Sequence, residues 1–111
     1  GTFVGTPRYA SPEQMLREPL TPASEVYAVG LIMWEALVGS PTVGSTDYGF
    51  CVEAHINGDP WVLPEDPSYP DGIRRIIEKS LAKQPAERYQ SCEELQHALH
   101  RFIMTRSTTK G

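Results

Sequence analysis

The chain has 111 residues, of which 40% are hydrophobic and 22% are charged, and it carries a formal net charge of −4. This size and composition are typical of one small globular domain and exclude an intrinsically disordered chain. The ten Lys and Arg residues are scattered along the sequence. Because binding to nucleic acid requires clustered positive charge, nucleic acid is not an expected partner.

The two cysteines, Cys51 and Cys92, form no CxxC pair and have no histidine at the spacing of a zinc site. Neither a disulfide framework nor a metal site is therefore expected, and a reducing, cytoplasmic location fits best. The chain does not open with a charged segment followed by an apolar one, so no signal peptide is expected.

The first strongly periodic segment is Val26–Val38 (VYAVGLIMWEALV), in which Glu35 is the only charge. Its apolar side chains occupy all sides of a 3.6-residue turn, which predicts a central helix buried on every side. The segment is shorter than the roughly twenty residues that a membrane span requires. Residues 21–24 offer capping hydroxyls, with Pro22 near the start, and Gly39 follows as the terminating residue.

The next segment, Tyr48–Asn57 (YGFCVEAHIN), predicts a short amphipathic helix that ends at Gly58, after a turn-rich stretch at residues 40–46. Residues 59–70 then contain four prolines, namely Pro60, Pro64, Pro67 and Pro70. Each proline removes a backbone donor and fixes φ, which predicts an ordered but irregular loop.

A third helix is predicted after Asp71, which we expect to cap it. Its apolar residues recur at helical spacing and its charged residues lie on the opposite face, as a surface helix with one buried side requires. The apolar residues are Ile73, Ile76, Ile77 and Leu81.

A last helix is predicted after the turn at residues 83–88, because Ser91 and Glu94 form a capping-box pattern. Its expected buried stripe consists of Cys92, Leu95, Leu99, Phe102 and Ile103. Residues 105–111 are polar and are predicted to be a disordered tail. The sequence as a whole predicts an all-α fold with a central buried helix, amphipathic helices and long ordered loops.

Three motifs, in matching order, resemble segments of the protein kinase large lobe, or C-lobe. They are Gly5-Thr6-Pro7-x-Tyr9-x-Ser11-Pro12-Glu13, Ser24-Glu25-Val26-Tyr27-Ala28-Val29-Gly30 and Lys83-Gln84-Pro85-Ala86-Glu87-Arg88. The pattern is most similar to bacterial serine/threonine kinases of the eukaryotic-like type. The resemblance implies that residues 1–104 run from the end of the activation segment to the last helices of the lobe.

The resemblance also implies a structural ion pair. Ser11-Pro12-Glu13 stands where the family has Ala-Pro-Glu, so Glu13 is expected to pair with Arg88 and to attach the activation segment to the helical core. Two unrelated surface charges are the alternative explanation of these residues.

In the same family the Gly-Thr-Pro stretch belongs to the loop that docks the substrate, which here is Gly5, Thr6, Pro7 and Tyr9. The Thr6 hydroxyl would help to position the catalytic aspartate and the acceptor residue, although an ordinary turn threonine is the alternative. Thr2 has the spacing of the activation-loop phosphorylation site.

Glu25 departs from the family pattern, which has an aspartate at the start of the central helix. The longer side chain changes how a carboxylate reaches the catalytic loop, whose backbone it would bind. An acid favoured by the helix dipole is the alternative explanation.

Phosphoryl transfer in this family uses a Gly-rich loop, a strand-borne Lys, a His-Arg-Asp loop and an Asp-Phe-Gly motif. None of these occurs in the chain. Asp47-Tyr48-Gly49 stands in the wrong order to be the metal motif, and His100-Arg101-Phe102 lacks the catalytic carboxylate. We therefore expect no catalytic residue here, and we expect ATP and Mg²⁺ to be cofactors of the intact kinase alone.

The three histidines, His55, His97 and His100, complete no metal-ligand pattern such as HExxH. Solvated histidines on helices are the expected outcome.

The resemblance implies a segment of an enzyme that transfers the γ-phosphoryl group of ATP to Ser or Thr of a protein, and that needs the missing small lobe and catalytic loop as partners. The alternative is a non-catalytic module, either pseudokinase-like or truncated, that binds another protein. A third possibility is an unrelated helical bundle, which would fold independently, whereas a piece of a lobe would expose apolar surface.

Overall fold

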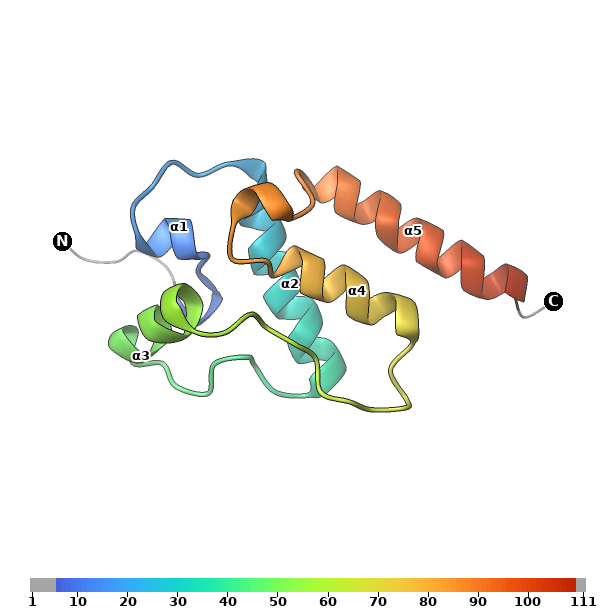
Figure 1. Ribbon diagram of the computed structural model, residues 1–111, viewed down its shortest axis with the longest axis horizontal. Helices are drawn as coiled ribbons and strands as arrows, with labels where there is room; N and C mark the ends of the chain where they lie inside the picture. The colour runs from blue at the N-terminus through green and yellow to red at the C-terminus, as the bar shows by residue number, and fades with distance from the viewer. Residues whose placement is uncertain (1–5, 110–111) are drawn as a thin grey trace.

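The computed structural model describes residues 6–109, and in residues 106–109 it describes the backbone alone. These residues form helices and loops without a β-strand, which confirms the predicted all-α fold (Figure 1). The elements are η1 (Pro7–Tyr9), α1 (Pro12–Met15), α2 (Pro22–Val38), α3 (Tyr48–Val52), η2 (Glu53–Asn57), α4 (Asp71–Ser80), η3 (Pro85–Glu87) and α5 (Cys92–Thr109). Of the short elements, η1 and η3 are 3₁₀ turns and η2 is a π-helical turn.

Helix α2 begins and ends at the residues that the sequence indicated. Thr21 precedes the helix, Pro22 is its first residue, and the Ser24 hydroxyl accepts a hydrogen bond from the Thr21 amide at 3.2 Å. Gly39 ends the helix with a φ of +95°, a left-handed conformation that glycine adopts without steric cost. The helix therefore starts four residues before the apolar run that revealed it.

The main core forms around α2, which runs through the middle of the molecule beside α4 (Figure 1). Its buried members are Tyr27, Leu31, Trp34, Leu63, Ile77 and Leu81. Gly30 permits the close approach of the two helices, because a Cβ atom there would lie 2.9 Å from both Leu81 Cδ2 and Ser80 Cβ. A larger residue at this position would force α4 away from α2.

The prediction that this helix is buried on every side is wrong along one flank. Ile32 is 58% exposed, and Glu25 and Ala36, which share its side of the helix, are also exposed. The elements that pack most extensively on α2 are η1, η3, α4 and α5, and this flank is left exposed to solvent. The described residues therefore leave an apolar side chain of this central helix uncovered.

Helix α4 has the predicted buried face, since Ile76, Ile77 and Leu81 are buried and Ile73 is partly buried. Its start differs from the prediction: Pro70 occupies the capping position, and Asp71 is the first helical residue without a side-chain capping bond. A carboxylate in the first turn still interacts favourably with the helix dipole.

Helix α5 differs more from its prediction. Leu95 is buried, but Cys92 is exposed and Ile103 is 58% exposed. Ala98 supplies the contact instead, in a cluster with Val26 and Ile76. Leu99 and Phe102 are partly buried against the same cluster, and the outer turns of α5 extend beyond α4 in Figure 1.

The tail that was predicted to be disordered from residue 105 is helical as far as Thr109. No glycine or proline interrupts the sequence between Cys92 and Thr109, so nothing in the chain stops the helix earlier. Residues 110 and 111 lie outside the described part of the chain.

The segment predicted as one short helix is helical throughout, first as α3 and then as the π-helical turn η2, and it ends before Gly58. Residues 59–70 contain no helix, as their prolines predicted, although Leu63 reaches the core. Across residues 6–109, no helix combines the length and the apolar character that crossing a membrane demands.

Candidate functional site

Glu13 and Arg88 form a buried, bidentate ion pair although they are 75 residues apart in the sequence. Arg88 Nη1 lies 2.6 Å from Glu13 Oε2, and Arg88 Nη2 lies 2.9 Å from Glu13 Oε1. Helix α1 presents the carboxylate, and the Ser11 hydroxyl caps this helix by accepting from the Gln14 amide. The two side chains make the contact that the motif resemblance led us to expect.

Every N–H group of Arg88 has an acceptor. Besides the carboxylate, the guanidinium donates to the carbonyls of Ala82 (2.7 Å), Ala23 (3.0 Å) and Lys83 (3.1 Å). A guanidinium has five donors, and all five are used here. Such complete satisfaction is the condition under which a buried charge is tolerated.

The carboxylate of Glu13 also accepts a hydrogen bond from the Ser24 hydroxyl at 2.6 Å, which joins α1 to the start of α2. Burial alone would raise the pKa of Glu13, but the hydrogen bonds from Arg88 and Ser24 outweigh it and lower the pKa below its usual value. The group therefore stays ionised, and the pair holds the segment after η1 against the helical core.

The predicted docking loop lies directly before this anchor. Thr6 is exposed, whereas Pro7 and Tyr9 are partly buried in the turn η1. The Tyr9 hydroxyl donates to the carboxylate of Glu35 on α2, and that carboxylate raises the pKa of Tyr9. Gly5 and Thr2, the other two predicted residues of this region, lie outside the described residues.

Glu25, the predicted acid of the central helix, is exposed in the first turn of α2. It makes no hydrogen bond or ion pair with the residues that the structure describes, and it does not contact the Glu13–Arg88 pair. Glu25 and Ile32, seven residues apart, are both exposed on the same flank of α2.

His55 was expected to be solvated, and this prediction is wrong because the side chain is fully buried. Its Nδ1 atom lies 2.7 Å from the Tyr27 hydroxyl, and its Nε2 atom lies 2.9 Å from the carbonyl oxygen of Arg8. Trp61 Nε1 donates to the same tyrosine hydroxyl at 2.9 Å. Burial lowers the pKa of His55 to about 4, so the ring is neutral at neutral pH.

Lys83 supports this cluster from the turn before η3. Its ammonium group donates to the carbonyls of Ala54 (2.8 Å) and His55 (3.0 Å), at the end of the π-helical turn, and lies 4.6 Å from the centre of the Trp61 ring. Burial lowers the pKa of Lys83 to about 8. Orphan carbonyls at a helix end are thus satisfied by a side chain.

The other two histidines, His97 and His100, are exposed on α5, as predicted. Asp47 of the Asp-Tyr-Gly stretch has a structural role, because its carboxylate accepts from the Phe50 amide at 2.9 Å and caps α3. Among the described residues there is no group of three or more His, Cys, Asp or Glu side chains that could hold a metal ion.

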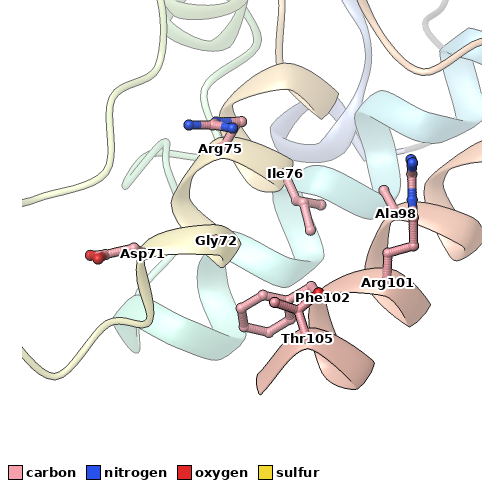
Figure 2. A pocket seen from close by; sticks show the side chains of 8 residues that line it. All are labelled: Asp71, Gly72, Arg75, Ile76, Ala98, Arg101, Phe102 and Thr105. Atoms are coloured by element: carbon pink, nitrogen blue, oxygen red, sulfur yellow. The ribbon is translucent and has the colours of Figure 1, made fainter. Parts of the chain in front are cut away.

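A groove between α4 and α5 is the concave surface shown in Figure 2. Phe102 of α5 faces Gly72 at the start of α4, and Arg75 and Arg101 extend from the two helices on its rim. A Cβ atom at Gly72 would lie 2.6 Å from the Phe102 ring, so glycine permits this contact. None of the predicted site residues lines the groove.

The arrangement is one that positions a loop. Two polar clusters, around Arg88 and around His55, attach the segment from Arg8 to Glu13 to the helical core. No motif pointed to the second cluster. The spacing of Cys51 and His55, four residues apart on one buried helical face, is the signal that could have revealed it.

Comparison with known proteins agrees with the motifs. Residues 1–100 match the family described as protein kinase domain. The chain is 37% identical over 91 residues to the serine/threonine-protein kinase PknA of Mycobacterium tuberculosis. The aligned region covers 82% of this chain and 21% of that protein. It is 31% identical over 104 residues to PknH of Mycobacterium bovis, covering 93% of the chain and 17% of the relative.

A similar match is found to the serine/threonine-protein kinase drp72 of Corynebacterium efficiens, with 38% identity over 100 residues, covering 89% of this chain and 19% of that protein. The chain thus spans about a fifth of the length of the curated relatives that it matches.

Proposed function

Because this chain belongs to the protein kinase domain family, we propose that it is the C-terminal part of the large lobe of a serine/threonine protein kinase. In this proposal residues 5–9 dock the protein substrate, and the intact protein transfers the γ-phosphoryl group of ATP to a Ser or Thr hydroxyl. The coarser assignment, a segment of a kinase domain, follows from the family; the roles of individual residues are our proposal.

The observation that carries the proposal is the Glu13–Arg88 pair. It fixes the segment immediately after Thr6 and Tyr9 to the helical core through contacts that are fully satisfied and almost inaccessible to solvent. A loop that presents a substrate must be held in one geometry, because a misplacement of about 1 Å can cost a hundredfold in rate. Thr6 stays exposed beside this anchor, where its hydroxyl can meet a partner.

The role proposed for Thr6 is to orient the acceptor hydroxyl and the catalytic aspartate through hydrogen bonds. Tyr9 attaches the loop to α2 through its hydrogen bond to Glu35. Thr2 is our proposed phosphorylation site, because a phosphate there would add negative charge four residues before Thr6.

ATP and Mg²⁺ are proposed as cofactors of the intact kinase, where they supply the phosphoryl group and neutralise its charge. The residues of this chain do not fit either one: the described part has no cluster of carboxylates for a metal ion, and the sequence has no Gly-rich phosphate loop. We therefore propose that the 111-residue chain alone transfers no phosphate, and that segments outside it hold both cofactors.

The exposed flank of α2 supports the same proposal. Ile32 on this helix and Leu16 and Leu20 in the connection before it are 58%, 51% and 60% exposed. A self-contained bundle would bury apolar residues of its central helix, whereas a piece of a lobe leaves them open. We propose that the flank, together with Glu25, faces the catalytic loop in the intact protein.

The experiment compares the full-length protein with the 111-residue chain, each incubated with γ-labelled ATP, Mg²⁺ and a generic protein substrate. We expect label on Ser or Thr with the full-length protein and none with the chain. Label incorporated by the chain alone would overturn its proposed inactivity. A full-length protein that labels no substrate would overturn the kinase assignment and favour the non-catalytic interaction module.

A variant pair tests the docking loop in the full-length protein. Thr6→Ala should lower kcat about a hundredfold, and Thr6→Ser should restore most of it, because serine keeps the hydroxyl. Thr46→Ala is the matched control, since Thr46 is an exposed loop threonine that belongs neither to the docking loop nor to the Glu13–Arg88 pair. Equal activity in all three variants would rule out the role of Thr6, and mapping of any phosphate on the protein itself would test Thr2.

A further inference from the structure

We propose that His55 is a positioning residue for the docking loop, which it holds by donating a hydrogen bond from its neutral ring to the carbonyl of Arg8. The proposal rests on the proposed function of residues 5–9. It adds a second attachment of this loop, made by a segment that lies 47 residues further along the chain and that carries none of the motifs.

The tautomer of His55 follows from its two partners. A backbone carbonyl can only accept, so the Nε2 atom that lies 2.9 Å from the Arg8 oxygen must carry the proton. In the neutral ring Nδ1 is then an acceptor, and it accepts a hydrogen bond from the Tyr27 hydroxyl 2.7 Å away. Both ring nitrogens are therefore engaged, and the ring orientation is fixed.

The network continues beyond the ring. Trp61 Nε1–H donates to the Tyr27 oxygen, which in turn donates to His55. Four separate segments meet in this chain of hydrogen bonds: the irregular loop, α2, the π-helical turn η2 and the docking loop. Buried hydrogen bonds in such a series polarise and strengthen one another.

The position of the Arg8 carbonyl makes this contact effective. Arg8 is the middle residue of the turn η1, whose own hydrogen bonds join the Tyr9 amide to the Thr6 carbonyl (3.0 Å) and the Ala10 amide to the Pro7 carbonyl (3.3 Å). The Arg8 carbonyl takes part in neither bond, so it needs a donor from outside the turn. His55 is that donor, and the carbonyl that it binds lies two residues after Thr6 and one before Tyr9.

The surroundings of His55 keep the ring neutral and immobile. Its neighbours are the Tyr27 ring of α2, the Trp61 ring at 5.8 Å, the backbone of Arg8, and Lys83, whose ammonium group holds the carbonyl of His55 itself. A proton on Nδ1 would oppose the hydroxyl proton of Tyr27 and would lie near the positive charge of Lys83. The backbone of His55 is also fixed, because Lys83 donates hydrogen bonds to the carbonyls of Ala54 and His55 in the π-helical turn.

The test uses three variants of the full-length protein: His55→Leu, His55→Gln and Ser80→Ala. Leucine removes the donor at similar volume, and glutamine keeps an N–H at a similar reach. Ser80 is the matched control, because it is equally buried and its hydroxyl donates to the Ile76 carbonyl on α4, away from the docking loop. The readouts are kcat and the KM values for a peptide substrate and for ATP.

We expect His55→Leu to raise the peptide KM about tenfold, because the one hydrogen bond that holds the docking loop is lost. We expect it to leave kcat and the ATP KM within about twofold. His55→Gln should restore the peptide KM. Ser80→Ala should lower the melting temperature and leave the peptide KM unchanged. A peptide KM in His55→Leu equal to that of the wild type would overturn the proposal, as would a peptide KM raised equally by Ser80→Ala.

The tautomer of His55 in the wild-type protein can be tested by NMR even if His55→Leu does not fold. In protein labelled with ¹⁵N-histidine, the ring should show the Nε2–H tautomer at pH 7 with slowly exchanging hydrogen; the Nδ1–H tautomer would contradict the assignment. An inactive wild-type protein would refute the proposed function, whereas an active one with unchanged peptide KM in His55→Leu refutes the role of His55 alone.

Discussion

Two buried polar clusters attach the same segment of the chain to α2, and they do so by different chemistry. The cluster around Arg88 is charged: a guanidinium and the carboxylate of Glu13 face each other, and Ser24 adds a hydroxyl. The cluster around His55 is neutral and consists of hydroxyl, indole, imidazole and carbonyl groups. The first holds Glu13, and the second holds Arg8, five residues earlier.

Tyr27 belongs to both clusters. The guanidinium of Arg88 lies 4.7 Å from the centre of its ring, while its hydroxyl binds His55. One fully buried side chain of α2 therefore presents its face to the charged cluster and its edge to the neutral one. The charged attachment thus requires every N–H donor of the guanidinium to be satisfied, whereas the neutral attachment requires one protonation state of the histidine ring.

The largest expected effect comes from breaking the charged cluster. Arg88→Met should destabilise the protein by about 3–5 kcal/mol, because it leaves the Glu13 carboxylate buried without its partner. Urea denaturation of the wild type and the variant measures the difference.

The double variant Glu13→Leu/Arg88→Met is the control for this prediction. It strands no charge, so it should recover part of the lost stability, although three carbonyls still lose their donor. A double variant that is less stable than Arg88→Met would contradict the view that the stranded carboxylate is the main cost.

A smaller effect is expected where the neutral cluster is broken at its centre. Tyr27→Phe keeps the ring under the guanidinium but removes the hydroxyl, which leaves Trp61 Nε1–H without an acceptor and His55 Nδ1 without a donor. The cost should be about 1–3 kcal/mol, as for other buried groups that lose a partner. Thermal and urea unfolding both report it.

Tyr89→Phe is the matched control, because the hydroxyl of this partly buried tyrosine makes no hydrogen bond within the described residues. We expect it to change the stability by less than about 0.5 kcal/mol. Equal losses in the two variants would mean that the neutral cluster contributes no more than an ordinary tyrosine.

The charged cluster was accessible from the sequence and the neutral one was not. Glu13 and Arg88 stand in short motifs of fixed order, so resemblance to the kinase large lobe was sufficient to pair them across the chain. His55 stands in a weak amphipathic segment, and a histidine on a helix is usually solvated. Besides the spacing of Cys51 and His55, the signal was Tyr27 itself, because a tyrosine hydroxyl on a buried core helix needs a polar partner nearby.

The fold was predictable for similar reasons. Strong periodicity placed α2 and α4, and clear caps also placed the ends of α2, because both signals are local. The exposure of Ile32 and of Ile103 could not be predicted from periodicity, which identifies an apolar face but does not say which element covers it. Helix α5 also continued past residue 105, since polar composition alone does not end a helix.

The slope of stability with pH separates the two clusters. The pKa of His55 is about 4 in the folded protein and 6.5 without burial, so between these values the unfolded chain binds the extra proton. The stability that depends on a neutral His55 is therefore complete above pH 6.5 and is lost as the pH falls toward 4, by at most about 1.4 kcal/mol per pH unit.

The pKa of Glu13 is lowered below its reference value of 4.5, so the stability from the charged cluster is present above pH 4.5 and is lost only below it. His55→Gln should thus flatten the stability curve between pH 6.5 and 4.5 and leave the steep loss at lower pH. His97→Gln, which alters an exposed histidine of α5, should leave both parts of the curve unchanged. A His55→Gln curve parallel to that of the wild type from pH 6.5 to 4.5 would show that the neutral cluster does not depend on the protonation of its histidine.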